Sequence, residues 1–169
     1  MADRPAPRPA PREPAVAERP AREREETELA EAARRLATSY QDFWSASNGE
    51  AMASMPDFYA PRVEFHGRVM SARALIEEKR RFVRRWPDRT YSPRADSMRV
   101  SCATAGDACT VRTLFDFAAT NARTGRRSAG TGQLELVVAL AGRTPVIVAE
   151  ASQVMRRGQL VADDGEDED

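Results

Sequence analysis

The sequence is poor in the residues from which metal and phosphate sites are built. Its 169 residues include one histidine, His66, and two cysteines, Cys102 and Cys109. That set does not make a zinc site. No glycine-rich phosphate loop is present either, because Gly130 and Gly132 fall inside a predicted strand, where glycine usually marks a bulge or bend. We therefore expect no metal and no cofactor.

Long apolar runs are also missing. No run approaches the ~18 residues that a membrane helix requires, and the first thirty residues lack the apolar centre of a secretory signal. We expect no membrane segment in this chain and a cytoplasmic location. Residues 1–26 are rich in Pro, Ala and Arg, and they suggest a spacer from a longer, anchored protein. If that is so and Cys102 and Cys109 are bridged, the periplasm is expected instead.

The charges balance overall, with 26 basic and 26 acidic side chains, but they are unevenly spread. Residues 163–169 carry six acids, and residues 27–162 keep an excess of six positive charges. This excess is modest for a nucleic-acid binder, so we expect no nucleic-acid partner. We predict three parts: a disordered spacer (1–26), one domain (27–157) and a disordered acidic tail (158–169).

Apolar residues at steps of three and four predict two long helices. The first runs from Thr27 to about Trp44, and a short helix over 50–55 follows it. The second begins after Ser71, a good N-cap, and ends before Pro87. Lys79 falls in the apolar stripe of this helix, which is formed by Leu75, Ile76, Phe82, Val83 and Trp86.

Alternating polar and apolar residues predict strands elsewhere. A short hairpin turns at Gly67, and four longer strands cover 90–104, 108–121, 128–141 and 145–157. Register across their turns sets Val111 opposite Val138 and, less favourably, Glu135 opposite Glu150. The resulting apolar face contains Val100, Cys102, Cys109, Val111, Thr113, Phe115, Phe117, Leu134, Leu136, Val138, Leu140, Ile147 and Ala149.

The two cysteines also face each other in this register. Opposite positions of an antiparallel hairpin lie within bridging distance, so Cys102 and Cys109 are candidates for a disulfide. A turn centred one residue later would offset them and leave two small buried hydrophobic residues. The sequence leaves both alternatives open.

This order of elements resembles the nuclear transport factor 2-like superfamily, and its SnoaL-like and ketosteroid-isomerase-like branches in particular. The resemblance covers Leu29 to Met155 and rests on FYAPRVEFHGRVMSARALIEEKRRF with the closing strands LELVVAL and PVIVAEASQVM. It implies an α+β cone in which helices pack in the concave face of a curved antiparallel sheet. Members include isomerases, dehydratases, hydrolases and cyclases, together with many proteins that catalyse nothing.

Enzymes of this superfamily typically place an Asp or His inside the cone, with a Tyr or a protonated Asp as hydrogen-bond donor. The resemblance therefore implies His66 or Asp57 as acid or base, with Tyr40 or Tyr59 as donor. Glu64 could orient His66, although a histidine beside a turn glycine is more often a surface residue. The predicted pocket wall consists of Phe43, Trp44, Phe65, Val111, Thr113, Phe115 and Leu136.

The predicted pocket face offers few polar side chains, which favours a non-catalytic accessory or interaction domain. Such a domain would hold a small apolar ligand or a partner segment in the cone. The alternative is an isomerase, dehydratase or cyclase that uses an Asp or His in the cone. A homodimer is expected through the outer sheet face, which contains Arg112, Leu114, Glu135, Val137, Val148 and Glu150.

Overall fold

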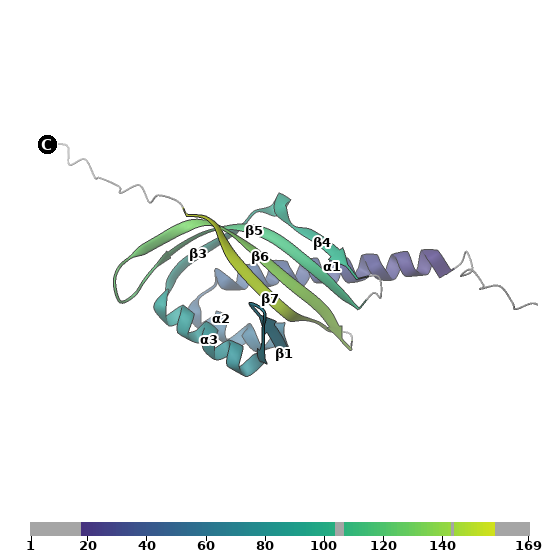
Figure 1. The fold of residues 1–169 in the computed structure, drawn as a ribbon, viewed down its shortest axis with the longest axis horizontal. Helices are drawn as coiled ribbons and strands as arrows, with labels where there is room; N and C mark the ends of the chain where they lie inside the picture. The colour runs from purple at the N-terminus through teal and green to yellow at the C-terminus, as the bar shows by residue number, and fades with distance from the viewer. Residues whose placement is uncertain (1–17, 104–106, 143, 158–169) are drawn as a thin grey trace, which may run out of the picture.

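The computed structural model describes residues 18–103, 107–142 and 144–157, and it has the predicted α+β architecture (Figure 1). Helices α1 and α3 lie on the concave side of a curved sheet, and their apolar faces share one core with it. The elements are α1 (Glu18–Trp44), α2 (Asn48–Ser54), the 3-10 helix η1 (Met55–Phe58), β1 (Tyr59–Phe65), β2 (Arg68–Ser71), α3 (Ala72–Arg85), β3 (Asp88–Pro93), the 3-10 helix η2 (Ala95–Ser97), β4 (Arg99–Cys102), β5 (Ala108–Thr120), β6 (Arg127–Ala141) and β7 (Thr144–Arg157).

The described strands form one mixed sheet in the order β2-β1-β7-β6-β5-β3, with β4 also paired to β5. β1 runs parallel to β7, and the other pairs are antiparallel. The predicted strand over 90–104 is divided into β3 and β4 by η2, and both pieces pair with β5.

Helix α1 begins at Glu18, earlier than the predicted Thr27, so the described end of the predicted spacer is helical. Its first buried residue is Leu29, and Ala33 and Ala37 follow on the same face with no exposed surface. Small side chains at this four-residue spacing let the helix approach the sheet closely. Residues 1–17 and the predicted acidic tail 158–169 lie outside the described residues.

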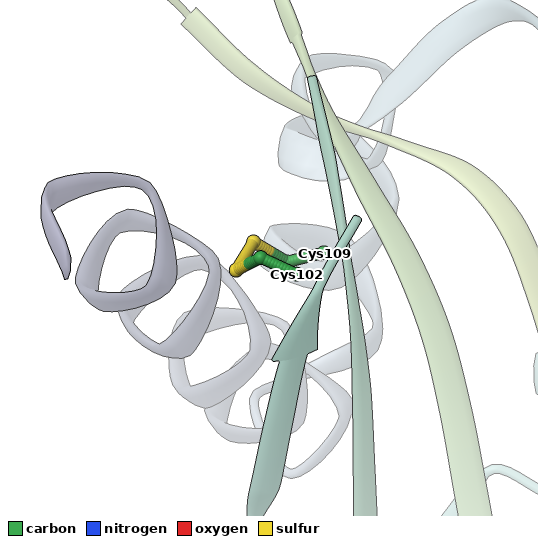
Figure 2. The surroundings of a disulfide bond; sticks show 2 residues. All are labelled: Cys102 and Cys109. Atoms are coloured by element: carbon green, nitrogen blue, oxygen red, sulfur yellow. A yellow bond between two sulfur atoms is a disulfide. The ribbon is translucent and has the colours of Figure 1, made fainter. Parts of the chain in front are cut away.

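Cys102 and Cys109 pair across β4 and β5 as predicted, and they form a disulfide with their Cα atoms 3.9 Å apart. Figure 2 shows the two sulfur atoms directed from the strand pair toward α1. Cys109 is fully buried among core residues. Of the two alternatives that the sequence left open, the structure contains the bridge.

The pairing of β5 with β6 differs from the predicted register by two residues. Val111 lies opposite Leu136, and Val138 lies opposite Cys109. The turn is centred on residues 123 and 124, one residue earlier than predicted, and the side chain of Asn121 accepts hydrogen bonds from the backbone N–H groups of these two residues. A shift of two residues leaves each side chain on its face of the sheet. Val111, Leu136 and Val138 are therefore buried as predicted.

A β-bulge in β7 overturns the prediction for Glu150. Val138 pairs with Ile147, but Val137 pairs with Ala149, so Val148 is an extra residue. Beyond it the faces of β7 exchange, and Glu150 points to the concave side, where it is only 6% exposed. The predicted outer position of Glu150 was wrong, as was the inner position of Ala149. The bulge also removes the expected Glu135–Glu150 repulsion, and Glu135 accepts a hydrogen bond from Arg112 on the outer face.

Candidate functional site

A cavity of about 350 Å³ lies on the concave side of the sheet, against α1, α3 and the end of β1. Six of its fourteen lining residues are Phe, Tyr or Trp, so the site suits a flat apolar molecule. The cavity is lined by Tyr40, Gln41, Trp44, Phe65, His66, Glu78, Lys79, Phe82, Tyr91, Pro93, Phe115, Leu134, Glu150 and Ser152.

A buried ion pair forms the polar part of this wall. Nζ of Lys79 on α3 lies 2.7 Å from Oε1 of Glu150 on β7, and each residue is 6% exposed. Lys79 points inward because it lies four residues from both Leu75 and Val83, on the buried stripe of α3. Glu150 points inward because of the bulge at Val148.

Two tyrosine hydroxyls complete the shell of the carboxylate. The hydroxyl of Tyr40 on α1 donates to Oε1 of Glu150 at 2.9 Å, and that of Tyr59 on β1 donates to Oε2 at 2.6 Å. Lys79 also donates to the Tyr40 oxygen at 3.1 Å, and the two tyrosine oxygens are 2.8 Å apart. We call Lys79, Glu150, Tyr40 and Tyr59 the Glu150 network. Its four side chains come from four elements, so only the complete cone assembles it.

Both tyrosines are held in the protonated, donating form. Burial raises the pKa of Tyr40 well above its ordinary value, and the negative charge of Glu150 raises it further. Burial likewise raises the pKa of Tyr59 well above its ordinary value, with added contributions from Tyr40 and Glu150. The network therefore offers two neutral hydroxyl donors beside one carboxylate and one cation.

Aromatic rings surround the Lys79 nitrogen. Nζ lies 4.9 Å from the ring centroid of Trp44 and 5.0 Å from that of Phe65. The rings of Tyr40 and Tyr59 are each 5.8 Å away. The negative faces of these rings stabilise a cation that has left water, in addition to the carboxylate.

The structure divides the predicted pocket wall into two groups. Trp44, Phe65 and Phe115 line the cavity. The other four predicted residues are buried in the surrounding core and are not part of the cavity wall: Phe43, Val111, Thr113 and Leu136.

Of the four predicted catalytic residues, two lie in the site and two do not. Tyr40 and Tyr59 belong to the Glu150 network. His66 lies at the rim with an exposed side chain, because it is a residue of the β1–β2 turn with φ at 48°. Asp57 is exposed in η1, away from the cavity wall. Among the described residues, no hydrogen bond joins Glu64 to His66.

The expectation that the cone contains few ionisable groups was wrong, since Lys79 and Glu150 meet inside it. One signal could have found Lys79: it is the only lysine of the chain, among 25 arginines, and it interrupts an apolar stripe. No comparable signal marks Glu150. Its side chain points inward because of the bulge at Val148, and β7 contains no glycine or turn residue that would predict a bulge there.

Within the described residues, no three His, Cys, Asp or Glu side chains gather as a metal site would require. In the same part of the chain, no helix has the length and apolar character needed to cross a membrane.

No protein-family model matches the chain, and no curated protein matches it. Solved structures do. An uncharacterised protein with a cystatin-like fold from Caulobacter vibrioides is 12% identical with a TM-score of 0.63, over 76% of this chain and 91% of that one. The chain has the nuclear transport factor 2-like fold.

Two further structures carry that name. A nuclear transport factor 2-like superfamily protein from Salmonella enterica is 15% identical with a TM-score of 0.55, over 83% of this chain and 97% of that one. A candidate dehydratase of the nuclear transport factor 2-like family from Streptomyces avermitilis is 10% identical with a TM-score of 0.60. The match covers 77% of this chain and 99% of that one. At these identities the likeness concerns the fold alone.

Proposed function

We propose that this chain binds a small, largely apolar molecule in the cone and holds a polar group of that molecule against the Glu150 network. The observation that carries the proposal is the position of the ion pair. Burying two charges costs more free energy than their attraction commonly returns, so such a pair is weak evidence of a stabilising role. Here the pair forms part of the cavity wall, where a ligand would meet it.

The aromatic wall supports the same proposal. Trp44, Phe82, Tyr91 and Phe115 give a ligand flat apolar surfaces, while the carboxylate and the hydroxyls give it direction. Binding of this kind needs no catalytic step. The proposed role is therefore that of an accessory domain whose cone holds a ligand.

Tryptophan fluorescence tests this proposal, because the indole of Trp44 is part of the wall. We expect 4-nitrobenzyl alcohol to quench the wild-type protein saturably. Ser152→Phe places a ring at a cavity-lining position of β7 and should abolish this quenching. Gln153→Phe adds the same ring to the next, outward-facing residue and should leave it unchanged. Equal quenching of all three proteins, or none of the wild type, would contradict the proposal.

A second candidate is acid–base catalysis by Glu150, since its carboxylate lines the cavity and accepts hydrogen bonds from two hydroxyls. With His66 at the rim and Asp57 outside, Glu150 takes the place of the predicted Asp or His. Hydrogen–deuterium exchange at the C–H groups beside the carbonyl of 2-indanone would measure proton abstraction. We expect the exchange to persist in Glu77→Gln, at a half-exposed position of α3, and to disappear in Glu150→Gln. Exchange at the uncatalysed rate in the wild type rejects this candidate.

We also propose that two copies pair through the outer sheet face, now without Glu150. Leu114, Val137 and Val148 leave half-buried apolar surface there, and Arg112 with Glu135 supplies both signs of charge, as a self-complementary interface needs. Light scattering should report a dimer for the wild type and a monomer for Val137→Glu. Ala53→Glu, at an exposed position of α2, should remain dimeric. A monomeric wild type would end this proposal.

A further inference from the structure

Lys79 stands apart from the other basic side chains of this protein. The chain uses arginine at 25 positions and lysine at this one, which is buried in the cavity wall. An arginine could also neutralise Glu150, and its planar guanidinium pairs with a carboxylate through two hydrogen bonds. Charge alone therefore does not account for a lysine here. A lysine adds a primary amine, which is a nucleophile once it has lost a proton.

The surroundings of Nζ provide what such an amine needs. Glu150 Oε1, at 2.7 Å, is placed to accept the proton. The Tyr40 oxygen accepts a hydrogen bond from Nζ at 3.1 Å and donates its own proton to Glu150, so a neutral hydroxyl lies beside the nitrogen. The cavity opens beside the nitrogen, between rings that could hold an aromatic ligand. A lysine on an exposed surface lacks this combination of a carboxylate, a hydroxyl and an adjacent cavity.

We propose that Lys79 is a covalent carbonyl-binding site, at which an aldehyde or ketone in the cavity condenses with Nζ to form an imine. This inference rests on the proposed ligand-binding function and names the class of ligand. Because an aromatic wall surrounds the amine, aryl aldehydes and aryl ketones are the preferred members of that class.

The condensation balances with groups that the structure contains. The Lys79 ammonium passes a proton to Glu150, and the amine adds to the carbonyl carbon while Tyr40 donates its proton to the carbonyl oxygen. The first adduct has a positively charged nitrogen and leaves Tyr40 as a phenolate, and one N–H proton of the adduct restores the Tyr40 hydroxyl. The neutral carbinolamine then loses its oxygen as water, using the proton stored on Glu150. The nitrogen lone pair forms the C=N bond, and the proton remaining on nitrogen makes the product an iminium. The sum is carbonyl plus ammonium giving protonated imine plus water, with Glu150 again ionised beside the positive nitrogen.

Reductive trapping tests the inference on the full chain. The protein is incubated with 4-nitrobenzaldehyde and sodium cyanoborohydride, and the product is digested and mapped by mass spectrometry. We expect one nitrobenzyl group on Lys79, blocked by an excess of 4-nitrobenzyl alcohol. Lys79→Arg keeps the charge and should lose the adduct. The α-amino group of the chain reports that the reagents are active.

Arg84→Lys supplies the matched control, because it places a lysine on the exposed face of the same helix. Bound-ligand proximity should make Lys79 react faster than the introduced amine by about tenfold or more. Equal rates, or no adduct at Lys79 while the α-amino group is labelled, would overturn the inference. Saturable quenching by the alcohol without an adduct at Lys79 would mean that this inference fails while the proposed ligand binding stands. A failure of the proposed function would show neither quenching nor an adduct at Lys79.

Discussion

The ammonium nitrogen of Lys79 lies 2.7 Å from the carboxylate of Glu150, although 71 residues separate the two in the sequence. Both side chains are almost completely buried, so each neutralises a charge that is largely withdrawn from water. This ion pair joins α3 to the middle of β7. It determines how the protein should respond when one partner is removed.

Removing one partner of this pair should destabilise the fold strongly. Glu150→Leu leaves an unpaired buried ammonium, and we expect the free energy of unfolding to fall by about 3–5 kcal/mol. The double variant Lys79→Met/Glu150→Leu should lose less than the sum of the single variants, since neither charge remains. Urea denaturation measures all three. For comparison, Glu77→Gln breaks the exposed Arg80–Glu77 pair on the same helix and should cost less than about 1 kcal/mol.

The three tyrosines of the chain should all resist ionisation in the folded state. Burial raises the pKa of Tyr91 to about 12, a rise that the nearby Arg89 cation reduces in part. The pKa values of Tyr40 and Tyr59 are also raised, by burial first. Absorbance at the phenolate band should therefore show almost no ionised tyrosine at about pH 10.5 in the native protein, and more than half ionised after denaturation.

The same pKa shifts predict the alkaline limit of stability. Below the unfolded tyrosine pKa of about 10, both states hold the protons and stability does not depend on these groups. Above it, the unfolded chain releases protons that the folded chain retains, so the free energy of unfolding falls by about 1.4 kcal/mol per pH unit for each tyrosine. Tyr40→Phe removes one of these groups and should make the fall in the free energy of unfolding shallower by about 1.4 kcal/mol per pH unit. A slope unchanged in the variant would contradict the assignment.

Gly130 and Gly49 should respond oppositely to alanine. A Cβ atom at Gly130 would overlap the backbone carbonyl oxygen of Arg156 on the neighbouring strand, so the strands must separate. We expect Gly130→Ala to lower the free energy of unfolding by about 1–3 kcal/mol. Gly49 lies in α2 with open space around it, and Gly49→Ala should raise stability by about 0.5–1 kcal/mol. Thermal unfolding of the wild type and the two variants should show a lower midpoint temperature for Gly130→Ala and a higher one for Gly49→Ala.

The disulfide should contribute a measurable share of stability. Its two cysteines are seven residues apart, and closing so short a loop is worth about 2–2.5 kcal/mol on the chain-entropy account. Thiol titration of the unfolded protein should find no free thiol before reduction and two after it. Dithiothreitol should destabilise the wild type by this amount and leave Cys102→Ala/Cys109→Ala unchanged. A titration that finds two free thiols without reductant would show that the bridge does not form.

Much of this fold could be predicted from the spacing of apolar residues along the sequence and from the residues that form turns. The facing cysteines and the buried positions Val111, Leu136 and Val138 followed from strand alternation, which a register error of two residues leaves intact. The site could not be predicted in the same way. One extra residue, Val148, exchanges the faces of β7 and brings Glu150 inside. His66 is the more conspicuous acid–base residue in the sequence, but the turn places it at the rim.

The parallel pairing of β1 with β7 has a consequence for synthesis on the ribosome. β1 is made early and pairs with β2, which follows it directly, but its other neighbour in the sheet is β7, the last described strand. The contacts between β1 and β7 are therefore among the most distant along the chain. Glu150, whose carboxylate accepts the hydrogen bond from Tyr59, is synthesised 91 residues after that tyrosine. A nascent chain that stops before Glu150 has no closed cone, because β7 is the strand that joins β1 to β6 in the sheet. Truncations in β7 should therefore aggregate rather than yield a smaller domain.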